Sequence, residues 1–158
     1  MTISEKIKCL EAAPLYHLPG KARPKHSNTV VSADKFGISN GRRFEIVVVP
    51  DSEKPFHILQ ATKKRQARSK LTWDQASVLV QAVSFGLNLY GNSTNGCFGT
   101  LQLEGLHLYF YGERRGRWHC SLSCLNGCLT LSLADLSRLS EGLAKARGIY
   151  IDLVEFGA

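Results

Sequence analysis

A long run of basic residues with no acid in it offers the clearest chemistry in this sequence. Positions 62–70 read TKKRQARSK and hold five cations: Lys63, Lys64, Arg65, Arg68 and Lys70. Shorter basic clusters occur at Arg42 and Arg43 and again at Arg114, Arg115 and Arg117. Such side chains in strand connections can bind phosphates, and each contact steepens the salt dependence of nucleic-acid binding. A single cluster is usually a solvated loop, whereas three in one antiparallel fold favour a nucleic-acid ligand.

Aromatic and apolar residues alternate in the segment 106–111, which reads LHLYFY. Successive side chains of a strand point to opposite faces, so His107, Tyr109 and Tyr111 share one face. His119, in a following strand, is the third candidate for stacking beside the two tyrosines. Rings on a solvated face suit the stacking of nucleic-acid bases. A protein contact is the equally weighted alternative, because aromatic residues are also enriched at interfaces.

The pair Asn126-Gly127 predicts a two-residue hairpin turn, and this turn sets the register of the flanking strands. The predicted pairs are Leu125 with Cys128, Cys124 with Leu129, and Leu122 with Leu131. One face is then apolar and packs under a helix: Trp118, Cys120, Leu122, Cys124, Leu129 and Leu131. The other face is mostly polar: Arg117, His119, Ser121, Ser123, Cys128 and Thr130.

The even spacing of Cys120, Cys124 and Cys128, with His119 beside them, invites comparison with a metal motif. Zinc needs ligands that converge on one point, and the predicted register sends Cys128 to the face opposite the other two cysteines. We therefore expect thiols that bind no metal, and we expect no other cofactor.

Motifs for catalysis are absent from the sequence, which has neither a phosphate-binding glycine loop nor a nucleophile elbow. The neighbouring acids Asp51 and Glu53 fall in a predicted turn. His119 and Cys120 point to opposite faces of one strand, which is poor geometry for a Cys/His pair. We expect a protein that is not an enzyme, and an unrecognised site using Cys128 and His119 ranks last among the alternatives.

The stretch LTWDQASVLVQAVSFGLNLYG, at positions 71–91, predicts the helix that organises the chain. Its apolar residues recur at helical spacing: Trp73, Ala76, Leu79, Val80, Val83, Leu87 and Tyr90. Thr72 and Gln75 have the spacing of a capping box, and Gly91 suits the C-terminal end. The sequence therefore predicts a helix over 73–90.

The remaining elements predict two consecutive β-β-β-β-α units. In the first unit, we expect strands at 28–32, 43–49, 56–61 and 66–71, before the helix. In the second, we expect strands at 98–103, 106–111, 117–125 and 128–131, a helix over 133–146 and a last strand at 149–156. Positions 71–79 align in kind with 131–139, and Phe56-His57 is matched by Trp118-His119. These matches favour a duplicated unit over chance.

Composition is that of an ordinary globular protein, with 44% hydrophobic and 21% charged residues in 158. We expect a basic N-terminal arm at 1–27 and one domain at 28–158, containing repeats at 28–91 and 97–156. A net charge of +7 favours an acidic partner. The sequence shows neither a membrane-spanning run nor a signal peptide, and its cysteines are odd in number: Cys9, Cys97, Cys120, Cys124 and Cys128. These features predict an intracellular, reducing compartment.

The order of elements over about 20–156, and the pattern L-[ST]-x-x-[QD] opening each helix, resemble the Whirly single-stranded DNA-binding domain. Structural relatives of that domain include the guide-RNA-binding and PUR-repeat proteins. Pro19-Gly20-Lys21-Ala22 is similar to the K-G-K-A motif of Whirly strands, with proline in place of the first lysine. The resemblance implies an α+β fold with two packed antiparallel sheets and two supporting helices, and it implies oligomers such as tetramers.

We therefore expect a non-enzymatic protein that binds single-stranded DNA or RNA with little sequence preference. The basic clusters would hold the backbone, while Tyr109, Tyr111 and His119 would stack bases. The alternative is a protein-interaction module, an assembly factor or inhibitor whose basic loops dock on an acidic partner.

Overall fold

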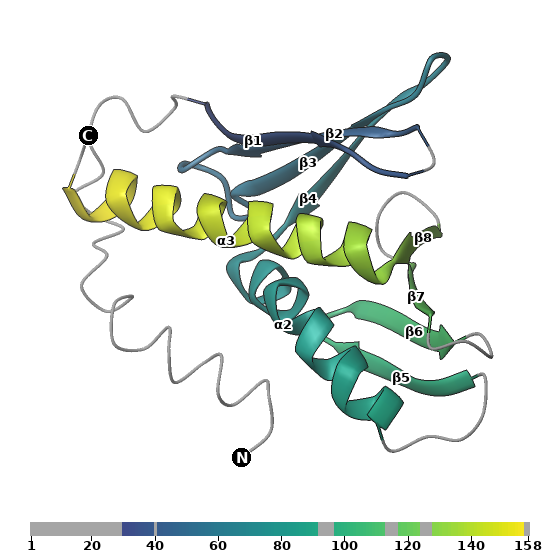
Figure 1. Cartoon of the computed structure of the whole chain (residues 1–158). Coiled ribbons are helices and arrows are strands. Elements are labelled where there is room, and N and C mark those ends of the chain that lie inside the picture. Colours follow the sequence, from purple (N-terminus) through teal and green to yellow (C-terminus); the bar gives the residue numbers. More distant parts are fainter. Residues whose placement is uncertain (1–29, 40, 92–96, 113–116, 124–127, 157–158) are drawn as a thin grey trace.

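Two four-stranded antiparallel sheets, each followed in the chain by a helix, form the described structure (Figure 1). The computed structural model describes residues 30–39, 41–91, 97–112, 117–123 and 128–156. The first unit contains β1 (Val31–Gly37), β2 (Arg43–Val48), β3 (Phe56–Ala61), β4 (Gln66–Leu71) and α2 (Trp73–Gly91). The second contains β5 (Cys97–Leu103), β6 (Leu106–Gly112), β7 (Trp118–Leu122), β8 (Leu129–Ser132) and α3 (Leu133–Phe156). The predicted fold class and the repeated β-β-β-β-α order are confirmed, whereas the predicted arm at 1–27 lies outside the described residues.

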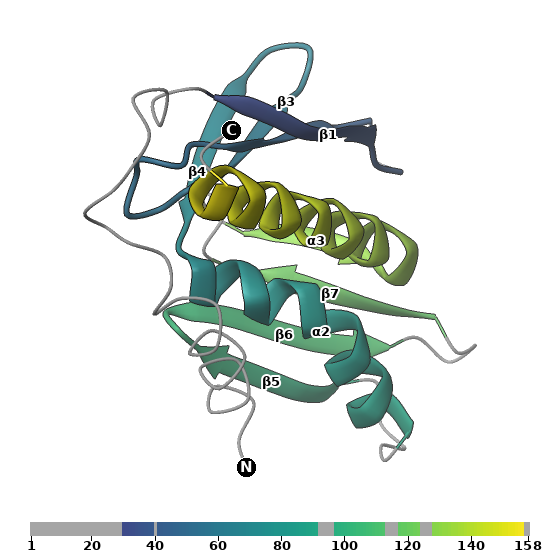
Figure 2. The same ribbon diagram turned by 90° about the vertical axis from the view of Figure 1, so that its left-hand side faces the viewer.

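The two helices lie between the two sheets (Figure 2). Helix α3 contacts β1 and β2 of the first sheet as well as β7 and β8 of the second, and α2 contacts β5 and β6. The Ser140 hydroxyl donates a 2.7 Å hydrogen bond to the Leu79 carbonyl and so joins the helices. Each sheet therefore has an inner face on the helices and an outer face turned away from them.

One hydrophobic cluster contains residues from both units. The first sheet contributes Ile46 and Ile58, and the second contributes Leu108 and Trp118, all nearly inaccessible to solvent. Alternation along the strands explains this burial, because every second side chain faces the helices. Within the described residues, neither helix is long and apolar enough to cross a bilayer.

Both helices begin with a hydroxyl side chain that caps an amide of the first turn. In α2, the Gln75 amide donates to Thr72 Oγ1 at 3.1 Å, and the Thr72 amide donates to Gln75 Oε1 at 2.9 Å. In α3, the Asp135 amide donates to Ser132 Oγ at 3.2 Å. Each bond satisfies an amide that has no partner inside the helix. The capping box predicted for the first helix is confirmed, and the equivalent bond in α3 agrees with the alignment of the two units.

The end of the chain differs from the prediction, because α3 continues to Phe156 and replaces the expected strand at 149–156. Ala146, Tyr150 and Leu153 follow one another at helical spacing and pack against the core. Gly148 lies inside this helix and does not end it. A Cβ added at Gly148 would have no atom within 4 Å, so no close contact requires a glycine there. Packing of the next turn therefore outweighs the local signal of a glycine.

The predicted register of the last hairpin is wrong by two residues. Leu122 pairs with Leu129 and Cys120 pairs with Leu131, so strand pairing ends before the Asn126-Gly127 pair, which lies outside the described residues. A shift of two keeps each side chain on its predicted face, because the strand period is two. The apolar face with Trp118, Cys120 and Leu122 is therefore confirmed.

Two further predictions are wrong, one on the bounds of a strand and one on a buried residue of a helix. The first strand is β1, Val31–Gly37, instead of 28–32; it extends past a bulge between Ser32 and Asp34 to pair Phe36 with Phe44. Leu87, predicted on the buried face of the first helix, is 49% exposed. Gly86 occupies that face instead, because the Trp118 and Phe110 rings lie too close for a side chain.

Candidate nucleic-acid interface

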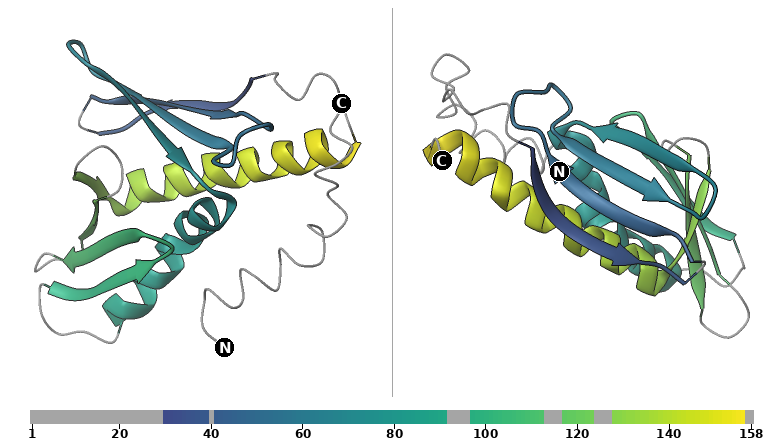
Figure 3. Two further views of the ribbon diagram at one scale, coloured as in Figure 1. Left: turned by 180° about the vertical axis from the view of Figure 1, so that it is seen from behind. Right: turned by 90° about the horizontal axis from the view of Figure 1, so that it is seen from above.

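The outer face of the first sheet carries three of the predicted basic residues, Arg43, Arg68 and Lys70; Figure 3 shows this sheet from above in its right panel. Residues paired directly across antiparallel strands share a face. The pairs define three rows across the sheet: Lys35, Glu45, Leu59 and Arg68; Gly37, Arg43, Ala61 and Gln66; Ser32, Val47, His57 and Lys70. We call these twelve residues the basic face.

Charge on the basic face is mostly positive. Lys35, Arg43, Arg68 and Lys70 are exposed, and Glu45 is the one acid among the twelve. Cations on neighbouring strands raise the local potential and attract anions, more strongly at low ionic strength. The basic face can therefore neutralise several phosphates of one ligand.

The predicted hairpin tip lies at one end of this face. Lys63, Lys64 and Arg65 are exposed in the turn between β3 and β4. The Thr62 amide donates to the Arg65 carbonyl at 2.8 Å, and the Arg65 amide donates to Thr62 Oγ1 at 3.1 Å. Arg42 lies in the β1–β2 connection at the same end, since Gly37, Arg43, Ala61 and Gln66 form the last row. Two of the three predicted basic connections are therefore brought together.

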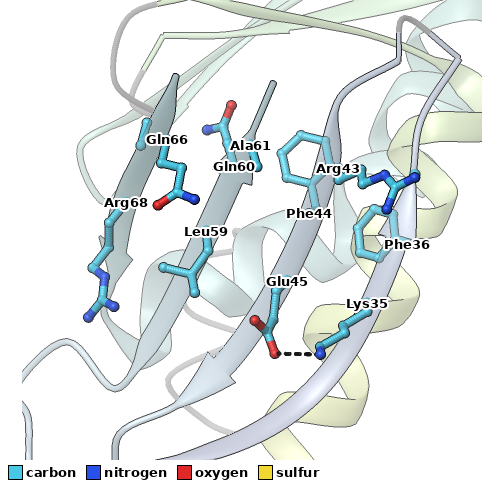
Figure 4. A pocket seen from close by; sticks show the side chains of 12 residues that line it. Lys35, Phe36, Arg43, Phe44, Glu45, Leu59, Gln60, Ala61, Gln66 and Arg68 are labelled. Atoms are coloured by element: carbon cyan, nitrogen blue, oxygen red, sulfur yellow. Dashed lines mark ion pairs between the residues drawn. The ribbon is translucent and has the colours of Figure 1, made fainter. Parts of the chain in front are cut away.

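A hollow of about 720 Å³ opens on the basic face. Figure 4 shows Arg43, Leu59, Gln66 and Arg68 around it, together with the ion pair of Lys35 and Glu45. Gly37 and Ala61 leave space there, because neither has a side chain longer than a methyl group. The hollow is large enough for a small organic group.

Glu45 stands among the cations of the basic face. Its Oε2 accepts a 2.7 Å hydrogen bond from Ser32 Oγ and lies 3.8 Å from Lys35 Nζ. No residue that the structure describes donates a hydrogen bond to Oε1, and the side chain is 29% exposed. These contacts hold the carboxylate in place and leave Oε1 and one lone pair of Oε2 available to a ligand.

His57 is buried beneath the same face, although its strand position points outward. Arg68 Nη1 lies 3.3 Å from His57 Nδ1, and because a guanidinium only donates, we assign Nδ1 as the acceptor. The proton then sits on Nε2, which is buried and has no hydrogen-bond partner within the described part of the chain. Burial, followed by the positive charges of Arg68 and Lys70, lowers the pKa of His57. A neutral His57 therefore holds Arg68 against the face.

The predicted aromatic residues lie on the outer face of the second sheet. The ring centroids of Tyr109 and Tyr111 are 5.7 Å apart, and those of Tyr111 and His119 are 5.5 Å apart. We call these three residues the aromatic strip. Tyr109 is 40% exposed. The paired neighbours on this face are polar: Thr100, Gln102, His107, Ser121, Thr130 and Ser132.

The structure thus separates the two predicted contact sets. The basic face belongs to the first sheet and the aromatic strip to the second, with the helices between them (Figure 2). Arg117 is exposed two residues before His119 and is the nearest described cation in the sequence. Arg114 and Arg115 lie outside the described residues. A ligand of one sheet therefore meets either the basic face or the aromatic strip.

The thiols do not gather into a site in the part of the chain that the structure describes. Cys120 is buried on the inner face of the second sheet, and Cys128 is exposed. Among the described residues, no three side chains of histidine, cysteine, aspartate or glutamate are placed to share a metal ion. Cys9 and Cys124 lie outside those residues.

Sequence reasoning missed several residues of the basic face. Glu45 was missed although it alternates with the predicted Arg43 in the strand RFEIVVV, so their common face was available from the sequence. Lys35 was missed because the first strand was expected to end before it. Leu59 and Gln66 carry no sequence signal for a site, since only strand register places them beside the cations.

No protein-family model matches the chain, and neither a curated protein nor a solved structure matches it. The chain's own residues therefore carry the functional argument.

Proposed function

We propose that this protein binds single-stranded DNA or RNA with little overall sequence preference and does so without catalysing a reaction. One observation carries the proposal: three exposed cations line a hollow on an open sheet face, beside the basic tip formed by Lys63, Lys64 and Arg65. Phosphates of a strand would lie along these cations, and an unpaired base could enter the hollow.

A single strand suits this face better than a duplex. The hollow lies between cations, so a base must leave its stack to reach it while the backbone remains on the arginines and lysines. Bases of a duplex are already paired and stacked, and unstacking them costs a few kcal/mol. The basic face would therefore favour unpaired nucleic acid.

The aromatic strip is the second contact in this proposal. Tyr109, Tyr111 and His119 would stack bases of a strand that reaches the second sheet, and Arg117 would bind its phosphate. The repeated β-β-β-β-α order supports the same function through its resemblance to Whirly and PUR-repeat proteins. Oligomers, which that resemblance also implies, would place strips and basic faces of several copies along one strand.

The aromatic strip also favours the second candidate function, a protein-interaction module. Tyrosines whose neighbours across the strands are polar residues without a fixed charge match the centre of protein interfaces, where aromatics are enriched and charges depleted. Such a protein would bind a partner through the strip and could use the basic face to hold an acidic segment. This candidate predicts affinity for a protein surface and none for oligonucleotides.

Fluorescence anisotropy with labelled single-stranded DNA, single-stranded RNA and duplex DNA tests the proposal. We expect the single strands to bind more tightly than the duplex at both low and physiological salt. Substituting Lys63, Lys64 and Arg65 by alanine should weaken binding. It should also reduce the slope of log K against log salt by about 2, because each phosphate contact on a single strand contributes roughly 0.7.

A matched control removes one cation from the other side of the first sheet. Lys145 lies on α3 and contacts Asp34 and Glu141, so Lys145→Gln lowers the net charge without altering the basic face. We expect this variant to bind as the wild type does. Equal and weak binding of all three nucleic acids, vanishing at physiological salt, would overturn the proposal.

A further inference from the structure

The hollow on the basic face combines apolar residues at its floor with charged residues around it. Leu59 is half-buried beside the small Ala61 on β3, and Arg43 and Arg68 lie on the strands to either side. Planar rings pack well on such a floor, and guanidinium groups can stack on the faces of bases. A nucleobase with a nearby phosphate therefore fits both the shape and the charge of the hollow.

The edge of such a base would meet Glu45. Its carboxylate can only accept hydrogen bonds, and Oε1 has no donor within the described residues. Ser32 holds Oε2 at 2.7 Å and leaves its second lone pair available. The carboxylate is therefore fixed in place and can accept two further bonds, one on each oxygen.

Guanine matches these two acceptors better than the other bases do. Its pairing edge presents two adjacent donors, N1–H and the N2 amino group. Adenine and cytosine each place a ring-nitrogen acceptor next to the amino group, and that acceptor would face a carboxylate oxygen. Uracil and thymine offer one N–H between two carbonyl oxygens. A fixed carboxylate thus accepts two bonds only from guanine.

We infer that the hollow takes one unstacked guanine of a bound single strand, with Glu45 as the residue that determines this preference. The inference rests on the proposed function and adds one selective position to an otherwise sequence-tolerant surface. Arg43 and Arg68 hold the neighbouring phosphates, and Gln66 lies at the far side of the hollow (Figure 4).

Binding of labelled oligothymidylate strands with one central substitution tests the inference. We expect a strand with one guanine to bind about ten-fold more tightly than the all-thymine strand, as one bidentate contact to a base allows. Inosine, which lacks the N2 amino group, should lose most of this gain. The inosine arm uses the wild-type protein and so does not depend on any variant folding.

Glu45→Gln should abolish the guanine preference while keeping affinity for the all-thymine strand. Glu53→Gln is the matched control, because Glu53 is exposed in the β2–β3 turn and does not line the hollow. This control should keep the wild-type preference. Equal affinity of the wild type for guanine, inosine and thymine strands would overturn the guanine inference and leave the proposed function standing.

Two other outcomes are separable from that result. Absence of binding to every single strand would overturn the proposed function and this inference with it. Guanosine monophosphate offers the same base and phosphate as a free nucleotide, so it is included as a competitor against the guanine strand. Displacement of the strand by an equal concentration of this nucleotide, but not of adenosine monophosphate, would overturn the assignment to a strand.

Discussion

Replacing Gly86 by alanine tests how closely α2 is fitted to the second sheet. A Cβ at this position would lie against the Trp118 ring, with Cη2 as its nearest atom and Cζ3 at 2.8 Å. It would also lie 3.0 Å from Phe110 Cδ1. Both rings are buried and Trp118 is 2% exposed, so neither can swing into solvent. We therefore expect Gly86→Ala to force the helix and sheet apart and to destabilise the protein.

The magnitude follows from two opposing contributions. Adding a methyl group to a filled core costs about 1–3 kcal/mol. Alanine in a helix interior is favoured over glycine by roughly 0.5–1 kcal/mol. Gly148→Ala in α3 gains the same helix contribution without the clash, because nothing lies within 4 Å of its Cβ. The difference between the two variants therefore measures the packing cost alone, about 1–3 kcal/mol.

Urea unfolding followed by circular dichroism is the measurement, with Gly86→Ala, Gly148→Ala and the wild type compared at the same pH. We expect Gly148→Ala to raise the midpoint and Gly86→Ala to lower it, with unchanged slopes. Thermal midpoints should separate by about 2–4 °C for each kcal/mol. Equal stability of the two variants would refute the close approach of α2 to Trp118.

Three further predictions concern pH and capping. Arg138 donates to both carboxylate oxygens of Asp34, at 2.5 and 2.9 Å, and this bonding lowers the pKa of Asp34 from its ordinary 3.8. The ionised Asp34 carboxylate therefore stabilises the folded protein above pH 3.8, and this stabilisation is lost as the pH falls through the lowered pKa. In acid-unfolding experiments, the stability of Asp34→Asn should not show this decrease. The pKa of His57 is also lowered in the folded protein, so as the pH drops below 6.5 the unfolded chain takes up a proton before the folded chain does. The free energy of unfolding should therefore fall below pH 6.5, and His57→Gln should remove that pH dependence in urea titrations. Thr72→Ala and Ser132→Ala should each lower the free energy of unfolding by about 1 kcal/mol. A loss near zero in either variant would contradict the capping hydrogen bond of that residue.

Local signals in the sequence determined the order of elements. The capping box of Thr72 and Gln75 starts α2, and the β-branched run after Arg43 forms β2, because both signals act within a few residues. Faces of strands were also available, since alternation has a period of two. That period explains why Cys120 stayed on the inner face despite the wrong hairpin register.

Tertiary structure decided what the local signals could not. Packing of Tyr150 and Leu153 against the core carries α3 past Gly148. Cross-strand register brings Lys35, Glu45 and Arg68 into one row, although they are far apart in the sequence. The helices lie between the sheets, so the aromatic strip and the basic face are both turned away from them, on separate outer faces. Each of these features depends on contacts between distant segments, whereas residue type and spacing report only on near neighbours.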